Sequence, residues 1–167
     1  MTTINFRKAI TLLASVLALN TVHAQDSKTD REKEKAVKVQ NIINANNFVF
    51  VAESALPMGG RTIYLTSPYN VRVSNDTLLA DLPYYGRAYS APINPSEGGI
   101  RFTSTNFDYK VQDRKKSGWD ILITPKDTRD VRQLFLTASE NGYASLQVTS
   151  NNRQAITFTG YIKELKK

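Results

Sequence analysis

Apolar and polar residues alternate with a period of two along most of the chain after Asn47, the pattern of strands with one buried face and one wet face. Breaks containing Gly, Pro or Asn separate the alternating runs, and Asn141-Gly142 is the strongest hairpin signal among them. The alternating runs span 47–54, 61–67, 69–74, 77–84, 99–105, 107–114, 118–125, 131–138, 143–150 and 154–163. They predict a mainly β fold, an antiparallel meander of eight to ten strands that forms a barrel or a sandwich.

The alternation also predicts which residues form the core. In the first run, Phe48, Phe50 and Ala52 share one face. The later runs predict these inward-facing residues: Phe107, Tyr109, Val111, Trp119, Ile121, Ile123, Leu134, Leu136, Ala138, Ala144, Leu146, Val148, Ile156, Phe158 and Ile162. Two interiors are possible. Trp119, Phe135 and their neighbours either fill the interior as a solid core or leave a cavity for a ligand.

A period of three to four residues precedes the strands, from about Asp30 to Asn46, and predicts one N-terminal α-helix. Its apolar stripe consists of Ala36, Val39, Ile42 and Ile43. Asp30 is a candidate N-cap, Glu34 and Lys38 form an i,i+4 pair, and the asparagines after Ile43 end the helix. The helix lies either across one open end of the sheet or along one face.

The first residues have the three-part pattern of a secretory signal peptide. Arg7 and Lys8 precede an apolar run of about 11 residues, which is short of the roughly 20 that a transmembrane helix needs. Small or short side chains at Val22 and Ala24 suit cleavage after Ala24, and no cysteine is present for lipid attachment. We therefore expect a signal peptide at 1–24, a disordered linker at 25–30 and a single domain with its helix at 31–167. The mature protein is then periplasmic or secreted, without a membrane span.

Composition narrows the possible chemistry. The chain has no cysteine, and its one histidine, His23, lies in the predicted signal peptide. Serine–histidine or cysteine–histidine catalysis, thiol redox chemistry and disulfides are therefore excluded from the mature chain, and we expect neither a metal site nor a cofactor. Removing Arg7 and Lys8 lowers the net charge from +7 to +5, carried by scattered lysines and arginines, a pattern that does not favour nucleic acid as a partner.

A densely aromatic segment, LPYYGRAYSAP at 82–92, is followed by Gly98-Gly99, and Ser150-Asn151-Asn152-Arg153 forms a late hairpin. With these segments, the mature chain resembles an uncharacterised family of secreted bacterial proteins of Bacteroidetes type, domain-of-unknown-function family number four-two-five-one. The resemblance implies an all-β fold and the cell envelope of a Gram-negative anaerobe. It supplies no catalytic residues.

The aromatic segment is the candidate ligand-binding site. Tyr84, Tyr85, Arg87 and Tyr89 have the residue types enriched at binding hot spots, and long loops in compact domains are often functional. The alternative is a structural corner in which the tyrosine rings close one end of the barrel and Arg87 binds loop carbonyls.

Three further groups have simpler structural explanations. The basic turn of Arg114, Lys115 and Lys116, near Lys110, is either a solvated hairpin tip or a contact for an anionic surface. Asp127 and Asp130 offer too few ligands for calcium and fit an Asx-type turn. A hydrolase would need two opposed acids, and the spacing of the candidate carboxylates selects no pair among Asp81, Glu97, Asp108 and Asp120.

The sequence thus predicts a non-enzymatic periplasmic binding module for a small amphipathic ligand or glycan fragment, with no catalytic residues. Alternatives are a structural or protein-interaction component of the envelope, whose partner would be an envelope protein, and a carboxylate-based hydrolase. In the first of these alternatives, the protein would dock on its partner through an exposed strand edge or through the N-terminal helix.

Overall fold

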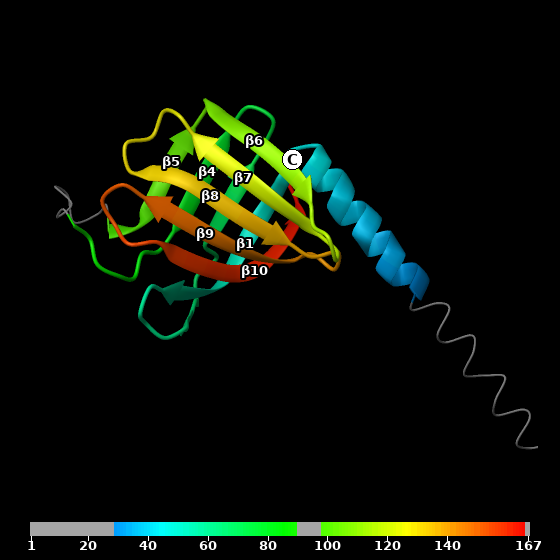
Figure 1. Ribbon diagram of the computed structural model, residues 1–167, viewed down its shortest axis with the longest axis horizontal. Helices are drawn as coiled ribbons and strands as arrows, with labels where there is room; N and C mark the ends of the chain where they lie inside the picture. Colours follow the sequence, from blue (N-terminus) through cyan, green and yellow to red (C-terminus); the bar gives the residue numbers. More distant parts are fainter. Residues whose placement is uncertain (1–28, 90–97, 166–167) are drawn as a thin grey trace, which may run out of the picture.

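The computed structural model describes residues 29–89 and 98–165, and Figure 1 shows a barrel-like sheet with one helix extending from it. The mainly β prediction is confirmed, and the sheet is a nearly closed barrel rather than a sandwich. All strand pairings are antiparallel, in the order β5-β4-β3-β1-β10-β9-β8-β7-β6, with β2 paired to β1. The strands are β1 (Phe48–Pro57), β2 (Ile63–Tyr64), β3 (Asn70–Val73), β4 (Leu78–Leu82), β5 (Ile100–Ser104), β6 (Phe107–Asp113), β7 (Trp119–Pro125), β8 (Val131–Ala138), β9 (Tyr143–Ser150) and β10 (Ile156–Glu164).

The barrel closes through a chain corner rather than through hydrogen bonds between its last two strands. β5 and β6 stand at opposite ends of the strand order, yet only Thr105 and Asn106 separate them in sequence. Asp127 holds this corner, since its Oδ2 accepts hydrogen bonds from the N–H groups of Thr105 (2.9 Å) and Asn106 (3.3 Å). The Lys126 N–H donates to the Asn106 carbonyl at 2.8 Å. A turn between β7 and β8 therefore fixes the point at which the sheet bends back on itself.

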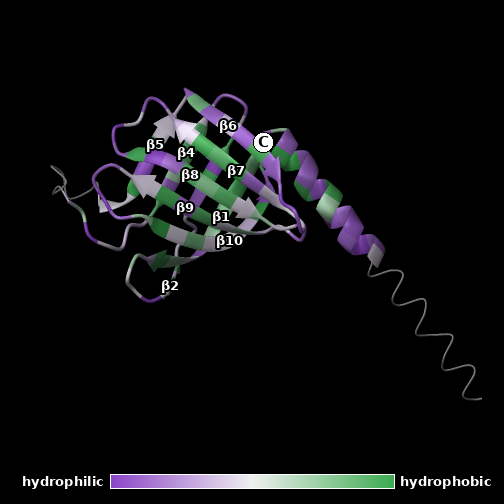
Figure 2. Ribbon diagram, in the orientation of Figure 1, coloured by the Kyte–Doolittle hydropathy of each residue, from purple (hydrophilic) through white to green (hydrophobic). Residues whose placement is uncertain are grey.

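Side chains of the inner face fill the barrel. Figure 2 shows apolar and polar residues alternating along the strands, as the period-two pattern predicts. The predicted inward-facing residues of β1, β7, β8, β9 and β10 are buried, while those of β6 are half-buried beside the corner seam. Phe135 is a correction: it points outward from β8 and pairs with Leu122, because residues that alternate with the buried Leu134 and Leu136 lie on the other face.

The predicted strand at 61–67 is shorter in the structure, where only Ile63 and Tyr64 form β2. The register of β1 shifts between Ala52 and Ser54, at a β-bulge, so β3 pairs with β1 before the bulge and β2 after it. Pro68 lies between the two strands, and proline cannot donate a ladder hydrogen bond. Together, the bulge and the proline divide the pairing along this edge of β1 between two short strands, β2 and β3.

The N-terminal helix packs on one end of the barrel through its last turns and extends away from it through its first turns (Figure 1). Residues 29–44 are helical, so Thr29 and Asp30 belong to the helix; the linker prediction for these two residues and the capping role of Asp30 are wrong. Strong helix formers follow at once, and they favour extension of the helix toward the N-terminus. The predicted pair forms, with Lys38 Nζ 2.8 Å from Glu34 Oε1. The signal peptide prediction lies outside the described residues.

The helix ends as the asparagines predict. Asn46 has a positive φ of 49° and its N–H donates to the Ile43 carbonyl, while the Asn47 N–H donates to that of Ile42. These two bonds form a Schellman motif. Val39 and Ile43 of the apolar stripe are buried, Ala36 and Ile42 are half-buried, and Tyr109 Oη donates to the Ile43 carbonyl at 3.0 Å. One β6 side chain thus anchors the end of the helix to the barrel.

Tyr109→Phe is expected to lower the free energy of unfolding by about 1 kcal/mol, because it removes the hydrogen bond to Ile43 and keeps the ring. Burial raises the pKa of the Tyr109 hydroxyl above its ordinary value. Because the folded protein holds the Tyr109 proton more tightly than the unfolded chain does, stability falls as pH rises above the pKa of about 10 that tyrosine has in the unfolded chain. Urea unfolding of both proteins from pH 8 to 11 should therefore show a smaller alkaline loss in Tyr109→Phe. An equal alkaline loss in both proteins would contradict this role.

Among the described residues, no helix is both long and apolar enough to cross a membrane.

Candidate functional site

The predicted binding loop begins as a short backbone extension of the sheet. Beyond β4, Ala88 forms an isolated antiparallel bridge with Arg153 of the β9–β10 turn. The Tyr89 N–H donates to the Asn152 carbonyl at 2.7 Å, and the Gln154 N–H donates to the Arg87 carbonyl at 3.1 Å. Residues 90–97 lie outside the described part of the chain. The first half of the loop is thereby tied to the β9–β10 turn at one end of the barrel, which we call the loop end.

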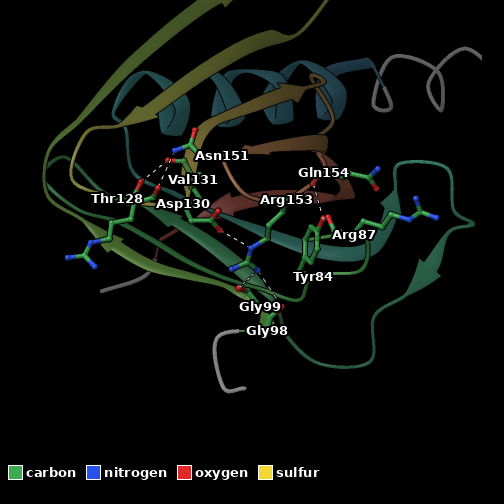
Figure 3. A network of polar contacts seen from close by, with 11 residues as sticks. Tyr84, Arg87, Gly98, Gly99, Thr128, Asp130, Val131, Asn151, Arg153 and Gln154 are labelled. Carbon is green, nitrogen blue, oxygen red and sulfur yellow. Dashed lines mark hydrogen bonds and ion pairs between the residues drawn. The ribbon is translucent and has the colours of Figure 1, made fainter. Parts of the chain in front are cut away.

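Tyr84 points into this contact rather than toward solvent (Figure 3). Its hydroxyl lies 2.8 Å from the Arg87 carbonyl and 3.1 Å from the Gln154 carbonyl, so one proton is shared between two acceptors. Burial raises the pKa of the Tyr84 hydroxyl, against the lowering effects of the Gln154 hydrogen bond and the Arg153 charge. The Tyr84 hydroxyl therefore fastens the loop to the β9–β10 turn.

Arg153 is the centre of the polar network in Figure 3. Its Nε lies 2.9 Å from Asp130 Oδ2, its Nη1 donates to the Gly99 carbonyl at 2.9 Å, and its guanidinium carbon lies 5.2 Å from the centre of the Tyr84 ring. The Arg153 side chain is 15% exposed and that of Asp130 is 28% exposed, which makes this pair the least exposed of the described ion pairs. Arg153 connects three separate loops of the barrel end.

The four predicted ligand-binding residues do not form one cluster. Tyr84 faces the Arg153 network, Tyr85 is half-buried against the core, and Arg87 and Tyr89 are exposed. In Figure 3 the Arg87 side chain points away from Arg153 and Tyr84. Tyr89, at 71% exposure, and Arg87 are the two members whose side chains solvent reaches freely.

A groove of about 470 Å³ lies on the other side of Arg153, between β5 and the β7–β8 turn. Its polar lining combines three cations and two carboxylates with the hydroxyls of Thr103 and Thr128, and Phe102 adds a half-buried aromatic ring. The charged lining residues are Arg101, Arg129, Arg153, Asp127 and Asp130. This loop-end groove brings together donors, acceptors and one apolar surface, the usual composition of a small-ligand site.

The β7–β8 turn holds the groove residues through its backbone. Asn151 donates from its backbone N–H to the Asp130 carbonyl at 2.8 Å and from Nδ2 to the Arg129 carbonyl at 3.1 Å. Thr128 Oγ1 donates to the Val131 carbonyl at 2.7 Å. Asp130 Oδ1 is buried without a hydrogen-bond partner among the described residues. The turn is therefore fixed at both sides of Arg129.

The groove residues are not grouped by any sequence pattern. The sequence marks Asp127 and Asp130 only as a carboxylate pair with too few ligands for calcium, and Arg153 only as part of the hairpin that carries the family resemblance. No spacing in the sequence connects Phe102 with Arg153, since strand pairing and the chain corner bring them together.

The other candidate groups have structural partners. Among the candidate hydrolase carboxylates, Asp81 pairs with Arg101 at 2.8 Å, Asp108 with Lys126 at 2.8 Å, and Asp120 with Arg114 at 3.5 Å; Glu97 lies outside the described residues. Hydrogen bonds from the Ser104 hydroxyl and the Thr105 N–H lower the pKa of Asp127. Within 29–89 and 98–165, no group of three or more His, Cys, Asp or Glu side chains is arranged to hold a metal ion. Lys115 and Lys116 are exposed at the β6–β7 turn.

None of the curated proteins compared with this chain matches it. Among solved structures, it is similar to the crystal structure of a DUF4251 family protein from Bacteroides eggerthii DSM 20697, with a TM-score of 0.58 and 18% sequence identity, over 78% of this chain and 87% of that one. At this identity the likeness establishes the fold alone. The family described as "Domain of unknown function (DUF4251)" matches residues 30–162, from the helix to the last strand, and the chain therefore belongs to the DUF4251 family.

Proposed function

We propose that this protein is a non-enzymatic binding module of the periplasm, or of the secreted fraction, that takes a small glycan fragment in the loop-end groove. The predicted signal peptide supports the compartment. The groove itself supports the binding role, and it is the single observation that carries the proposal.

The chemistry of the groove suits a sugar. Each sugar hydroxyl is both a donor and an acceptor, and a binding site must therefore supply both kinds of partner. Guanidinium groups donate and the Asp127 carboxylate accepts, while the Thr103 hydroxyl does either. The Thr128 hydroxyl donates to the Val131 carbonyl and can still accept. The half-buried ring of Phe102 offers an apolar surface to the carbon-bound face of a sugar ring.

The filled interior favours a surface site over an internal cavity. Large side chains at the centre of the barrel are fully buried, among them Phe48, Phe50 and Phe158. The groove at the loop end has the volume of a small-ligand site, about 470 Å³, and lies between backbone segments that are held in place.

Titration calorimetry of the mature protein against a panel of short glycans tests the proposal. Thr103→Tyr places a ring in the groove at an exposed strand position where tyrosine is well tolerated, and it should abolish binding while the melting temperature is kept. Thr157→Tyr, on the outer face of β10 and outside the groove, is the matched control and should bind like the wild type. Equal binding by the wild type and Thr103→Tyr, or no binding of any glycan, would reject the groove as the site.

Arg87 and Tyr89 extend the proposed binding face across the β9–β10 turn. Both are exposed and both belong to a segment whose backbone is bonded to that turn. The Arg87→Ala/Tyr89→Ala double variant leaves the Tyr84 ring and the partly buried Tyr85 intact, and weaker glycan binding at unchanged stability is the expected result. Unchanged affinity would restrict the site to the groove.

A second candidate function is a structural or protein-interaction component of the envelope. The filled core favours it, and so do three exposed large apolar side chains at the β1–β2 hairpin: Leu56, Met58 and Tyr64. Native mass spectrometry of the protein isolated from its own envelope separates the two functions. A small added mass supports the binding module, whereas a second protein chain supports the interaction role.

A further inference from the structure

We propose that the loop-end groove selects glycans that carry a carboxylate, and that Arg129 binds this group. The inference rests on the proposed function, because it names the substrate class of the same groove. It follows from the difference between Arg129 and the other two groove arginines.

The other two guanidiniums already have carboxylate partners. Arg101 Nε lies 2.8 Å from Asp81 Oδ1, and Arg153 Nε lies 2.9 Å from Asp130 Oδ2. Among the described residues, no hydrogen bond or ion pair involves the side chain of Arg129, which is exposed at the groove. Arg129 therefore offers its planar fork of donors to a ligand without first leaving a partner.

Hydrogen bonds fix the backbone around Arg129, although its side chain has no hydrogen-bond or ion-pair partner among the described residues. Asn151 bonds to the carbonyls of both Arg129 and Asp130, and the preceding Thr128 bonds across the turn to Val131. A fixed backbone leaves only side-chain freedom to be lost on binding, which lowers the entropic cost.

The charge balance of the groove favours a single negative charge. Three guanidiniums and two carboxylates line it, which leaves a net charge of +1. A phosphate, with nearly two negative charges, would meet repulsion from Asp127 and Asp130, whereas a carboxylate brings one charge and the planar geometry that pairs with arginine in bidentate fashion. A sulfate ester on a sugar also brings one negative charge, but it lacks the planar two-oxygen geometry of a carboxylate.

The test compares each of several uronic-acid oligosaccharides, including a tetragalacturonide, with its carboxyl-reduced neutral form and with a sulfated neutral counterpart. Calorimetry of the mature protein should show about two- to fivefold tighter binding of the acidic form, the scale of one ion pair at an exposed site. Arg129→Gln should remove this preference, so that the ratio of the affinities for the acidic and neutral forms falls to about one. Arg132→Gln, an exposed cation on β8 outside the groove, should retain the preference.

The outcomes separate the two proposals. Equal affinity for the acidic and neutral forms would overturn carboxylate selection and leave the glycan-binding function standing. A preference that survives in Arg129→Gln, or one that is stronger for the sulfated form, would also overturn the inference. If no form of any pair binds, the proposed function fails, and carboxylate selection fails with it.

Discussion

Gly160→Ala is expected to lower the free energy of unfolding by about 3 kcal/mol or more, which corresponds to a loss of about 10 °C in melting temperature. A Cβ at this position would fall far inside van der Waals contact with the carbonyl oxygen of Val51 and crowd the Cα of Ala52. Gly160 pairs with Ala52 immediately before the β1 bulge, so neither strand can move away without breaking the pairing that joins β1 to β10. Thermal and urea unfolding measure the effect.

Gly98→Ala is the matched control, because no atom lies within 4 Å of its added Cβ and its φ is outside the left-handed region. It should unfold within about 0.5 kcal/mol of the wild type. A Gly160→Ala variant as stable as Gly98→Ala would show that the bulge relaxes and that the close approach of the two strands is not required.

Arg153→Met is the second variant with a large expected effect, and it should lower the free energy of unfolding by about 2–3 kcal/mol. The substitution keeps an apolar stem against Tyr84 but leaves the Asp130 carboxylate without its cation. One oxygen of that carboxylate is already buried without a hydrogen-bond partner in the part of the chain that the structure describes. Removing one partner of a largely buried ion pair costs about 3–5 kcal/mol, and the partial exposure of Asp130 reduces this figure. Chemical unfolding at pH 7 gives the value.

Arg101→Met supplies the comparison at the same end of the barrel. Its ion pair with Asp81 is 60% and 47% exposed, and such pairs contribute about 0–1 kcal/mol. The double variant Arg153→Met/Asp130→Leu should recover part of the loss seen in Arg153→Met, since no unpaired charge remains. If Arg153→Met proves no more harmful than Arg101→Met, Arg153 does not hold the loops together.

The strands were predictable because each buries one face against a common core. Period-two alternation therefore located β8 and β9 at their observed bounds and identified the inward positions of β7 and β10. It was less reliable at β2, where the bulge in a distant strand, not the local pattern, decides how long the pairing continues. Phe135 was misplaced because hydrophobicity alone does not exclude a large apolar side chain from the outer face.

The sequence indicates the aromatic loop of the candidate site but not the residues of the groove. The aromatic loop does lie at an end of the barrel, but Tyr84 is engaged by backbone carbonyls of the loop and of the β9–β10 turn. The groove depends on contacts between residues distant in sequence, such as Arg153 with Asp130, 23 positions away, and with Gly99, 54 positions away. Nothing in a single sequence specifies which loops meet at a barrel end, and composition therefore identified the residue types but not their neighbours.

The strand order also has a consequence for how the chain folds. β1, the first described strand, pairs with β10, the last described strand, whereas β5 and β6 are joined by the chain without pairing along their edges. If the chain were circular and were followed from β6, the strands would come in the order β6 to β10, then β1 to β5. Each strand would then pair with the next one, except that β1 pairs with both β2 and β3. A circular permutant that begins at Phe107, with the helix joined to β10 by a linker, would have strand pairings of shorter range, and its β5–β6 corner would be held only by the hydrogen bonds that join Asp127 and Lys126 to Thr105 and Asn106. Such a chain is expected to fold faster than the natural one, in which the pairing of β1 with β10 joins the strands most distant in sequence.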